Sequence, residues 1–502
     1  MSNDASVTRL SGWDQVAMRS YMSKVLCFPF DNTKIDAAAA HIEASLAKLA
    51  QHRPDFAGTL EVRAGGIVHH ITNTSNVIPF FVEDISSDFA YTSYEALKAA
   101  EFPPGAFVHP RFMVPCRLTE GEPGVPVLIL KAFVIPGGLF LGTYFCHAFA
   151  DGGCLKILLD TFSGLTRGHV VEGPKTKKIE APFANESNVK DGNEDRLNVL
   201  LDRVPEYTVL DTPTGPTTPN FRADGVPMES IDKIGKIFVF DNERLKKLRC
   251  SVLDASAMAA AAEEDGHGNV LSMPTLPSNY SCLAALTWAH ICRARLADPI
   301  KYVPYVRGTD DVALLQTMVN WKSRALIASN PNYFGNATAI AVTRLPTKDS
   351  ILSRASENPL DLSRLTFAIE KTVLGVDDEF VCDRTELFSR VPDPRLVGLR
   401  FDPRTPQDLG FNTWRFIGAD TQWAIPGVGG LSSASSASSA SSAAKPDAIR
   451  RVQMAWNMSG ALILPAKMSS TTHELLVTLP RSSMELLCSD AEWMKWVDHV
   501  IG

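Results

Sequence analysis

The sequence predicts an α/β protein built from two domains. The chain has 502 residues, more than a single hydrophobic core usually serves. Helical and strand-like patterns alternate in both halves. Between the halves, residues 167–230 are polar and rich in Pro, Gly, Asp and Lys. We therefore expect an N-terminal domain over residues 1–210, a crossover linker over 211–230 and a C-terminal domain over 231–502.

The first half begins with a predicted helix over residues 34–52, where apolar residues recur at three- and four-residue spacing. Residues 58–63 and 66–71 alternate between apolar and polar side chains around an Ala-Gly-Gly turn, which predicts a hairpin. The apolar runs 127–134 and 139–146 are separated by Pro-Gly-Gly and predict neighbouring strands of a buried sheet. Helical spacing returns after residue 153, so the unit is strand, loop, helix.

The second half repeats this alternation. Residues 283–295 predict a helix, and residues 337–343, 460–465 and 474–479 predict strands. Residues 431–444 form a Ser/Ala tract of low complexity, which cannot repay the entropy of ordering. We expect this tract to be a flexible surface loop of the C-terminal domain.

Composition narrows the possible functions. Hydrophobic residues make up 45% and charged residues 21%, which is typical of a globular protein. A net charge of -7 without a long Lys/Arg cluster argues against a nucleic-acid partner. Without a signal-like start or a run of roughly 18 apolar residues, we expect a cytoplasmic protein with no membrane partner. Scattered cysteines and the lack of Cys-x-x-Cys and His-Glu-x-x-His patterns predict free thiols and no metal.

His147 is the candidate catalytic residue, because it directly follows the second buried strand. Its imidazole, with an ordinary pKa near ~6.5, can take a proton from a hydroxyl at neutral pH and return it later. Asp151 could orient the imidazole or cap the following helix, and Gly152 and Gly153 favour the cap. The two glycines would also let the backbone approach a ligand closely. The alternative is that His147 is a core histidine at a strand end with no role in catalysis.

The complete run His-x-x-x-Asp-Gly after a buried strand resembles the BAHD acyltransferase family, and the likeness extends over nearly the whole chain. It is closest to the fungal branch that includes trichothecene O-acetyltransferases. Four further segments carry the resemblance: the opening Leu-Ser-x-x-Asp-Gln at residues 10–15, the helix at 280–295, Asn-Trp-Lys-Ser-Arg at 320–324, and Tyr-Phe-Gly-Asn at 333–336. The family's Asp-Phe-Gly-Trp-Gly motif is not intact, although residues 412–429 resemble its neighbourhood.

This resemblance implies two chloramphenicol-acetyltransferase-like domains with a solvent channel between them and His147 at its centre. It implies a monomeric O-acyltransferase (EC 2.3.1) with no bound cofactor, which uses acyl-CoA as co-substrate, with acetyl-CoA as the preferred donor. The implied acceptor is a small-molecule alcohol of secondary metabolism, such as a terpenoid or a polyketide. The implied mechanism is a ternary complex in which His147 is the general base.

The resemblance also implies roles for residues around His147. Asp151 and Gly152 would be structural. Arg324 could contact the phosphates of CoA, but the preferred role is to brace the domain interface through an ion pair with Asp151. The candidates for contact with acyl-CoA or with the oxyanion are Gly153, Trp414, Asp420 and Trp423.

Two alternatives stay open. Condensation-type enzymes share this fold and take the acyl group from a carrier protein, but their motif begins with two histidines, and here Cys146 stands at the first. A repurposed member of the fold, either a cyclase or a binding protein, would not transfer acyl groups at all. The altered stretch between Asp420 and Gly429 is compatible with that second alternative.

Overall fold

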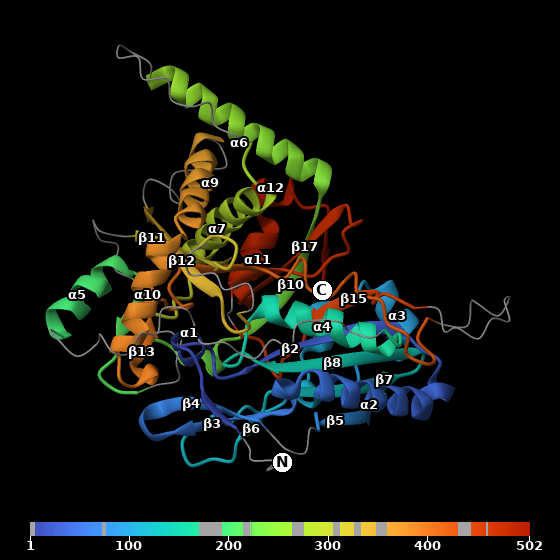
Figure 1. Ribbon diagram of the computed structural model, residues 1–502. Helices are drawn as coiled ribbons and strands as arrows, with labels where there is room; N and C mark the ends of the chain where they lie inside the picture. The colour runs from blue at the N-terminus through green and yellow to red at the C-terminus, as the bar shows by residue number, and fades with distance from the viewer. Residues whose placement is uncertain are drawn as a thin grey trace.

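The chain alternates strands and helices through two halves that lie against each other (Figure 1). The computed structural model describes residues 6–72, 77–169, 193–213, 221, 223–263, 276–304, 312–325, 333–347, 359–429, 443–457 and 460–502. The strands of the first half are β1 (Val7–Arg9), β2 (Tyr21–Pro29), β3 (Thr59–Arg63), β4 (Ile67–Ile71), β5 (Phe80–Asp84), β6 (Val125–Pro126), β7 (Leu128–Ile135), β8 (Gly138–Cys146) and β9 (Tyr207–Val209). Its helices are α1 (Gly12–Gln15), α2 (Ile35–His52), α3 (Tyr94–Ala99), α4 (Gly152–Thr166) and α5 (Asn193–Arg203).

The second half continues the same alternation. Its strands are β10 (Lys233–Asp241), β11 (Val312–Asn320), β12 (Thr338–Pro346), β13 (Val397–Leu399), β14 (Asp408–Thr413), β15 (Ala448–Arg451), β16 (Gly460–Ile463), β17 (Thr472–Pro480) and β18 (His499–Ile501). Its helices are α6 (Asn242–Glu263), α7 (Asn279–Ala297), α9 (Pro359–Leu374), α10 (Asp378–Arg390), α11 (Arg481–Ser489) and α12 (Ala491–Met494). The predicted helices at 34–52 and 283–295 and all the predicted strands are confirmed.

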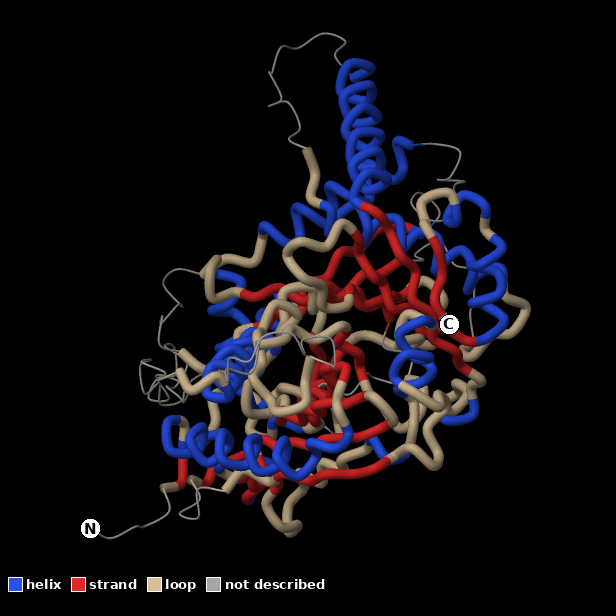
Figure 2. The backbone as a smooth tube through the Cα atoms, turned by 90° about the vertical axis from the view of Figure 1, so that its right-hand side faces the viewer, coloured by secondary structure: helices blue, strands red, loops and turns tan. Residues whose placement is uncertain are grey.

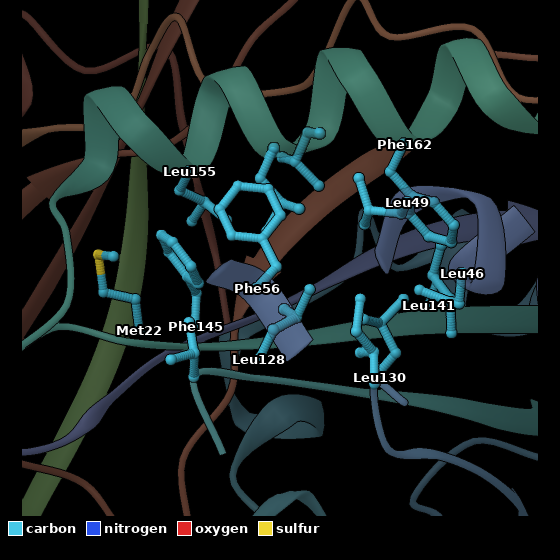
Figure 3. Packing of buried hydrophobic residues seen from close by; sticks show 14 of the residues in the cluster. Met22, Leu46, Leu49, Phe56, Leu128, Leu130, Leu141, Phe145, Leu155 and Phe162 are labelled. Carbon is cyan, nitrogen blue, oxygen red and sulfur yellow. The ribbon is translucent and has the colours of Figure 1, made fainter. Parts of the chain in front are cut away.

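A five-stranded sheet in the order β15-β2-β8-β7-β5 forms the centre of the first half. The predicted neighbours β7 and β8 pair antiparallel, and every residue of β8 is buried. Helices α2 and α4 contribute to the main core on one face of this sheet, because their apolar residues recur at helical spacing (Figure 3). The labelled side chains in this view are Met22, Leu46, Leu49, Phe56, Leu128, Leu130, Leu141, Phe145, Leu155 and Phe162.

A seven-stranded sheet in the order β12-β11-β14-β16-β17-β10-β18 forms the centre of the second half. Helix α7 is buried along nearly its whole length and packs with α6, α9 and α11 into a second core. Helix α6 lies on the outer side of this half in both views (Figures 1 and 2). Each half is therefore a sheet covered by helices, which is the predicted α/β architecture.

The two halves exchange segments. Strand β15, from late in the chain, pairs with β2 at the edge of the first-half sheet. Residues 417–428 join the core of the first half. Conversely, β9 pairs with β13, and α5 packs against α10 in the second half. The predicted bounds of 1–210 and 231–502 do not include this exchange, because local composition carries no information about which distant segments pack together.

The predicted loop at 431–444 lies outside the described residues except for 443 and 444. Ala444 forms an isolated bridge with Trp423, in which each backbone N–H donates to the other residue's carbonyl at 2.8 Å. The predicted crossover at 211–230 is described except for residues 214–220 and 222.

A buried ion pair fixes the segment around β9 to the second half. The Arg384 guanidinium on α10 donates two hydrogen bonds to the Glu206 carboxylate, at 2.7 and 3.0 Å. Side-chain exposure is only 5% for Arg384 and 1% for Glu206, so water cannot replace either partner. Removing one partner of such a pair leaves the other charge buried without compensation.

We expect Arg384→Met to lower the free energy of unfolding by about 3 to 5 kcal/mol, because Glu206 loses its buried counter-ion. Urea denaturation followed by circular dichroism measures this change. Arg481→Met is the matched control, because Arg481 pairs with Asp232 at 2.7 Å on the surface. Similar stability losses in both variants would contradict a special contribution from the buried pair.

Candidate active site

His147 lies at the end of β8, where the two halves meet. Its backbone N–H donates to the carbonyl of Ser20 at 2.8 Å. Its carbonyl accepts a hydrogen bond from the Asn336 side-chain amide, just before β12 in the second half, at 2.9 Å. The backbone of His147 is therefore held from both halves, while the residue itself stays half-buried.

The surroundings of His147 favour the neutral imidazole. Burial lowers the pKa of His147 below its ordinary value of 6.5, and the nearby Lys24 ammonium contributes to the lowering. The Asp151 carboxylate and the Asn336 side chain act in the opposite direction but do not cancel the effect. The Nδ1 atom is buried and has no hydrogen-bond partner among the described residues. A neutral imidazole in this position can accept a proton from a ligand.

Asp151 holds the loop after His147 in place through four hydrogen bonds. Its Oδ1 atom accepts from the backbone N–H groups of Gly153 at 3.0 Å and Cys154 at 3.1 Å, so Asp151 is the cap of helix α4. Its Oδ2 atom accepts from the Ala337 N–H at 2.9 Å and from the Thr338 hydroxyl at 2.8 Å. The carboxylate therefore joins α4 of the first half to β12 of the second.

The predicted ion pair between Arg324 and Asp151 is wrong. The Arg324 guanidinium donates to the carbonyl of Val373 at 3.2 Å and is exposed. The Asp151 carboxylate instead accepts hydrogen bonds from backbone N–H groups and a hydroxyl group. The sequence contained no sign of this, because Ala337 donates through its backbone and Thr338 is an ordinary residue at the start of β12.

Asp14 and Asn336 are structural residues of the site to which sequence reasoning assigned no role. The fully buried Asp14 carboxylate accepts from the backbone N–H and the side-chain amide of Asn336, both at 2.9 Å, and from the Ser11 hydroxyl at 2.6 Å. The same Asn336 amide donates to His147. The sequence did point to both residues, because they belong to the segments at 10–15 and 333–336 that carry the family resemblance.

Lys24 is a second residue that the sequence reasoning missed. It lies in the middle of β2, is fully buried, and its Nζ atom stands 3.8 Å from the centre of the Trp414 ring. Burial and the neighbouring Arg451 lower the pKa of Lys24 to about 7. The sequence could have indicated this residue, because it is a lysine on the inward face of a mostly apolar strand.

The other candidates take different positions. The Trp423 indole is fully buried in the first-half core and donates to the Thr421 hydroxyl at 2.8 Å. The Gly153 N–H donates to Asp151 at 3.0 Å. Asp420 is exposed and pairs with Lys445 at 2.6 Å. Trp414 alone among these candidates contacts Lys24.

A cavity of about 310 Å³ lies between the edge strand β15 and the loop at residues 465–474. His147 is not among its lining residues. Its charged lining residues are Lys98, Glu101, Asp447, Arg450, Lys467 and Glu474. In the described part of the chain, no helix is long and apolar enough to cross a membrane, and no cluster of three metal-ligating side chains occurs.

We expect Asp151→Asn to lower the free energy of unfolding by about 2 to 4 kcal/mol, because the new amide faces two donors that lose their acceptor. Thr338→Val is the matched control. It removes one of the four donors and should cost about 1 kcal/mol. Equal losses in urea denaturation would show that Asp151 is not the main link between the halves at this point.

Known proteins resemble the chain in both sequence and structure. Residues 21–163 match the family model of the trichothecene 3-O-acetyltransferase-like N-terminal domain. The acyltransferase easC of Emericella nidulans is 23% identical over 80% of each chain. The eremophilane O-acetyltransferase prx11 of Penicillium rubens is 22% identical over 81% of this chain and 84% of its own.

The fold also matches a solved structure along its whole length. The crystal structure of F. graminearum TRI101 complexed with coenzyme A and T-2 mycotoxin has a TM-score of 0.70 and 17% identity, and covers 99% of this chain and 100% of its own. The likeness in fold therefore extends over both halves. In sequence, the chain is therefore similar to fungal acyltransferases, and its residues 21–163 are similar to the N-terminal domain of trichothecene 3-O-acetyltransferase-like proteins.

Proposed function

We propose that the protein transfers an acetyl group from acetyl-CoA to a hydroxyl group of a terpenoid, with His147 as the general base. The observation that carries the proposal is the half-buried, neutral imidazole of His147, whose backbone is fixed from both halves. A base must be unprotonated at working pH and must be held firmly near the reacting atoms. The lowered pKa of His147 and the hydrogen bonds that anchor its backbone support this assignment.

The names of relatives support the choice of substrates. The Penicillium relatives are eremophilane O-acetyltransferases, and eremophilanes are terpenoids. Structures of F. graminearum TRI101 contain coenzyme A together with T-2 mycotoxin or deoxynivalenol. We therefore propose acyl-CoA as co-substrate and a small-molecule alcohol as acceptor.

The proposed reaction runs in one ternary complex. The His147 imidazole takes the proton of the acceptor hydroxyl while the oxygen attacks the thioester carbonyl carbon. The resulting tetrahedral oxyanion collapses, the carbon–sulfur bond breaks, and the imidazolium returns its proton to the leaving thiolate. The products are an ester and free CoA, and His147 is neutral again for the next cycle.

The structure supports separate roles for the residues around the base. Asp151 and Asn336 bind the backbone and the helix cap on either side of His147, so we assign them to positioning. Preorganised groups of this kind prevent the base from moving away from the acceptor. His147 alone is assigned to proton transfer.

We expect His147→Ala to lower kcat by about 10² to 10⁴, because the acceptor hydroxyl loses its base. The measurement is CoA thiol release from acetyl-CoA with a panel of hydroxylated eremophilanes and trichothecenes, repeated with an acyl-carrier protein as donor. His169→Ala is the matched control, because His169 is exposed near the end of α4. Unchanged release in His147→Ala would exclude His147 as the base, and transfer only from the carrier protein would overturn CoA as the donor.

The pH dependence provides an independent test. Because burial lowers the pKa of His147 below 6.5, the imidazole is neutral and active at pH 7 and above. We expect kcat/KM to be level across neutral pH and to decline only in acid, as the base becomes protonated at a pH below 6.5. A decline that begins above pH 7 would contradict the desolvated, neutral imidazole.

A further inference from the structure

Lys24 and His147 point to the same face of the first-half sheet. On that face, the pair after Lys24 in the ladder of β2 and β8 is Met22 with Phe145. One step further, the His147 backbone N–H continues the ladder and donates to the carbonyl of Ser20 at 2.8 Å. Side chains two residues apart lie on the same side of a strand. Lys24 and His147 are therefore neighbours on this face, separated by a single pair of residues.

The Lys24 ammonium is not neutralised by the protein around it. The residue is fully buried, and its Nζ atom has no hydrogen-bond partner in the part of the chain that the structure describes. Its contact is the face of the Trp414 ring, whose centre lies 3.8 Å from Nζ and which attracts a cation without cancelling its charge. In the interior, such a charge acts over a longer distance than at the surface, because water screens it less.

The separation suits an effect through charge. Lys24 and Ser20, the residue opposite His147, are four positions apart, which is about 13 Å between their Cα atoms. The four-carbon stem of a lysine can cover about half of that distance. At an effective dielectric constant of about 20, two unit charges about 7 Å apart repel each other enough to change an equilibrium constant by roughly tenfold or more. An imidazolium at His147 would experience this repulsion.

The surroundings of the two groups decide which one binds a proton first. Burial and the Arg451 charge lower the pKa of Lys24 to about 7. Burial, with a contribution from Lys24, lowers the pKa of His147 below 6.5, although the Asp151 carboxylate and the Asn336 amide favour the imidazolium. As the pH falls, Lys24 therefore becomes charged before His147. His147 does not shift Lys24 in return, because the imidazole is still neutral at the pH where Lys24 titrates.

We propose that Lys24 is a positioning residue for acyl transfer, whose buried ammonium keeps His147 unprotonated between turnovers. The inference rests on the proposed transferase function and extends it to the second proton transfer. Once the imidazolium has formed, the same charge favours the return of its proton: the imidazolium N–H bond breaks as the S–H bond of CoA forms. Lys24 itself gives up no proton in this scheme, so its charge alone is required.

The first test is the pH dependence of four enzymes. kcat/KM for acetyl-CoA with a hydroxylated eremophilane is measured for wild type, Lys24→Met, Lys24→Arg and Lys48→Met. At the pH where the wild type has lost half of its plateau value, Lys24→Met should retain about threefold to tenfold less of its own plateau, because its imidazole is protonated at a higher pH. Lys24→Arg keeps the charge and should keep the profile. Lys48→Met removes an exposed lysine of α2 and should also keep it.

A titration followed by NMR measures the protonation of His147 without turnover. The protein is labelled in its histidine rings, and the His147 signal is the one missing from His147→Ala. The midpoint of this signal should move to higher pH in Lys24→Met and should not rise in Lys24→Arg or Lys48→Met. If Lys24 only packs against Trp414, its replacement changes the melting temperature but not this midpoint. Lys24→Gln also removes the charge and takes the place of Lys24→Met if that variant does not fold.

Each outcome decides one question. A His147 midpoint that stays in place without the Lys24 charge overturns the proposal, even if kcat/KM falls. A midpoint that rises as far in Lys24→Arg as in Lys24→Met also overturns it, because the charge is then not the cause. If no acceptor gives CoA release, the proposed transferase function fails. The NMR titration still decides in that case whether Lys24 controls the protonation of His147.

Discussion

The side-chain amide of Asn336 is the contact on which the site depends. One nitrogen donates both to the Asp14 carboxylate near the start of the chain and to the carbonyl of His147. Three segments that are far apart in sequence therefore meet at one polar group, buried between the halves. Because an unmet donor or acceptor costs much more in the interior than at the surface, this network accepts few alternative arrangements. The position of the catalytic candidate follows from it.

The local sequence pattern predicted those helices, strands and caps whose formation depends on residues close together in the chain. Helix α2 and strands β7 and β8 were predicted because helical spacing and unbroken apolar runs report burial directly. The Asp151 cap was also predictable, since two glycines follow a short acidic side chain at the start of an apolar helix. In each case, the residues that decide the structure lie within one or two turns of each other.

Long-range partners could not be predicted in this way. Arg324 was assigned to Asp151 by likeness to relatives, yet Ala337 and Thr338 donate to that carboxylate. Nothing in an ordinary strand sequence indicates such donors. Lys24 could have been noticed, because the residues two positions away on either side, Met22 and Leu26, both point into the core. The surroundings of its amine, however, could not be predicted. Its neighbours Arg451 and Trp414 are nearly 400 residues or more away in sequence.

Strand β15 has a consequence for how the protein can move. It is covalently part of the second half, yet it is hydrogen-bonded along β2 into the first-half sheet. Opening the halves like a hinge would break that strand pairing and uncover the apolar side of an edge strand, so large domain separation is a form of partial unfolding. Access to His147 must then come from local motions of loops and side chains, because the strand pairing keeps the two halves together. Neither half is a natural unit for expression by itself, since each would lose strands or core residues that the other supplies.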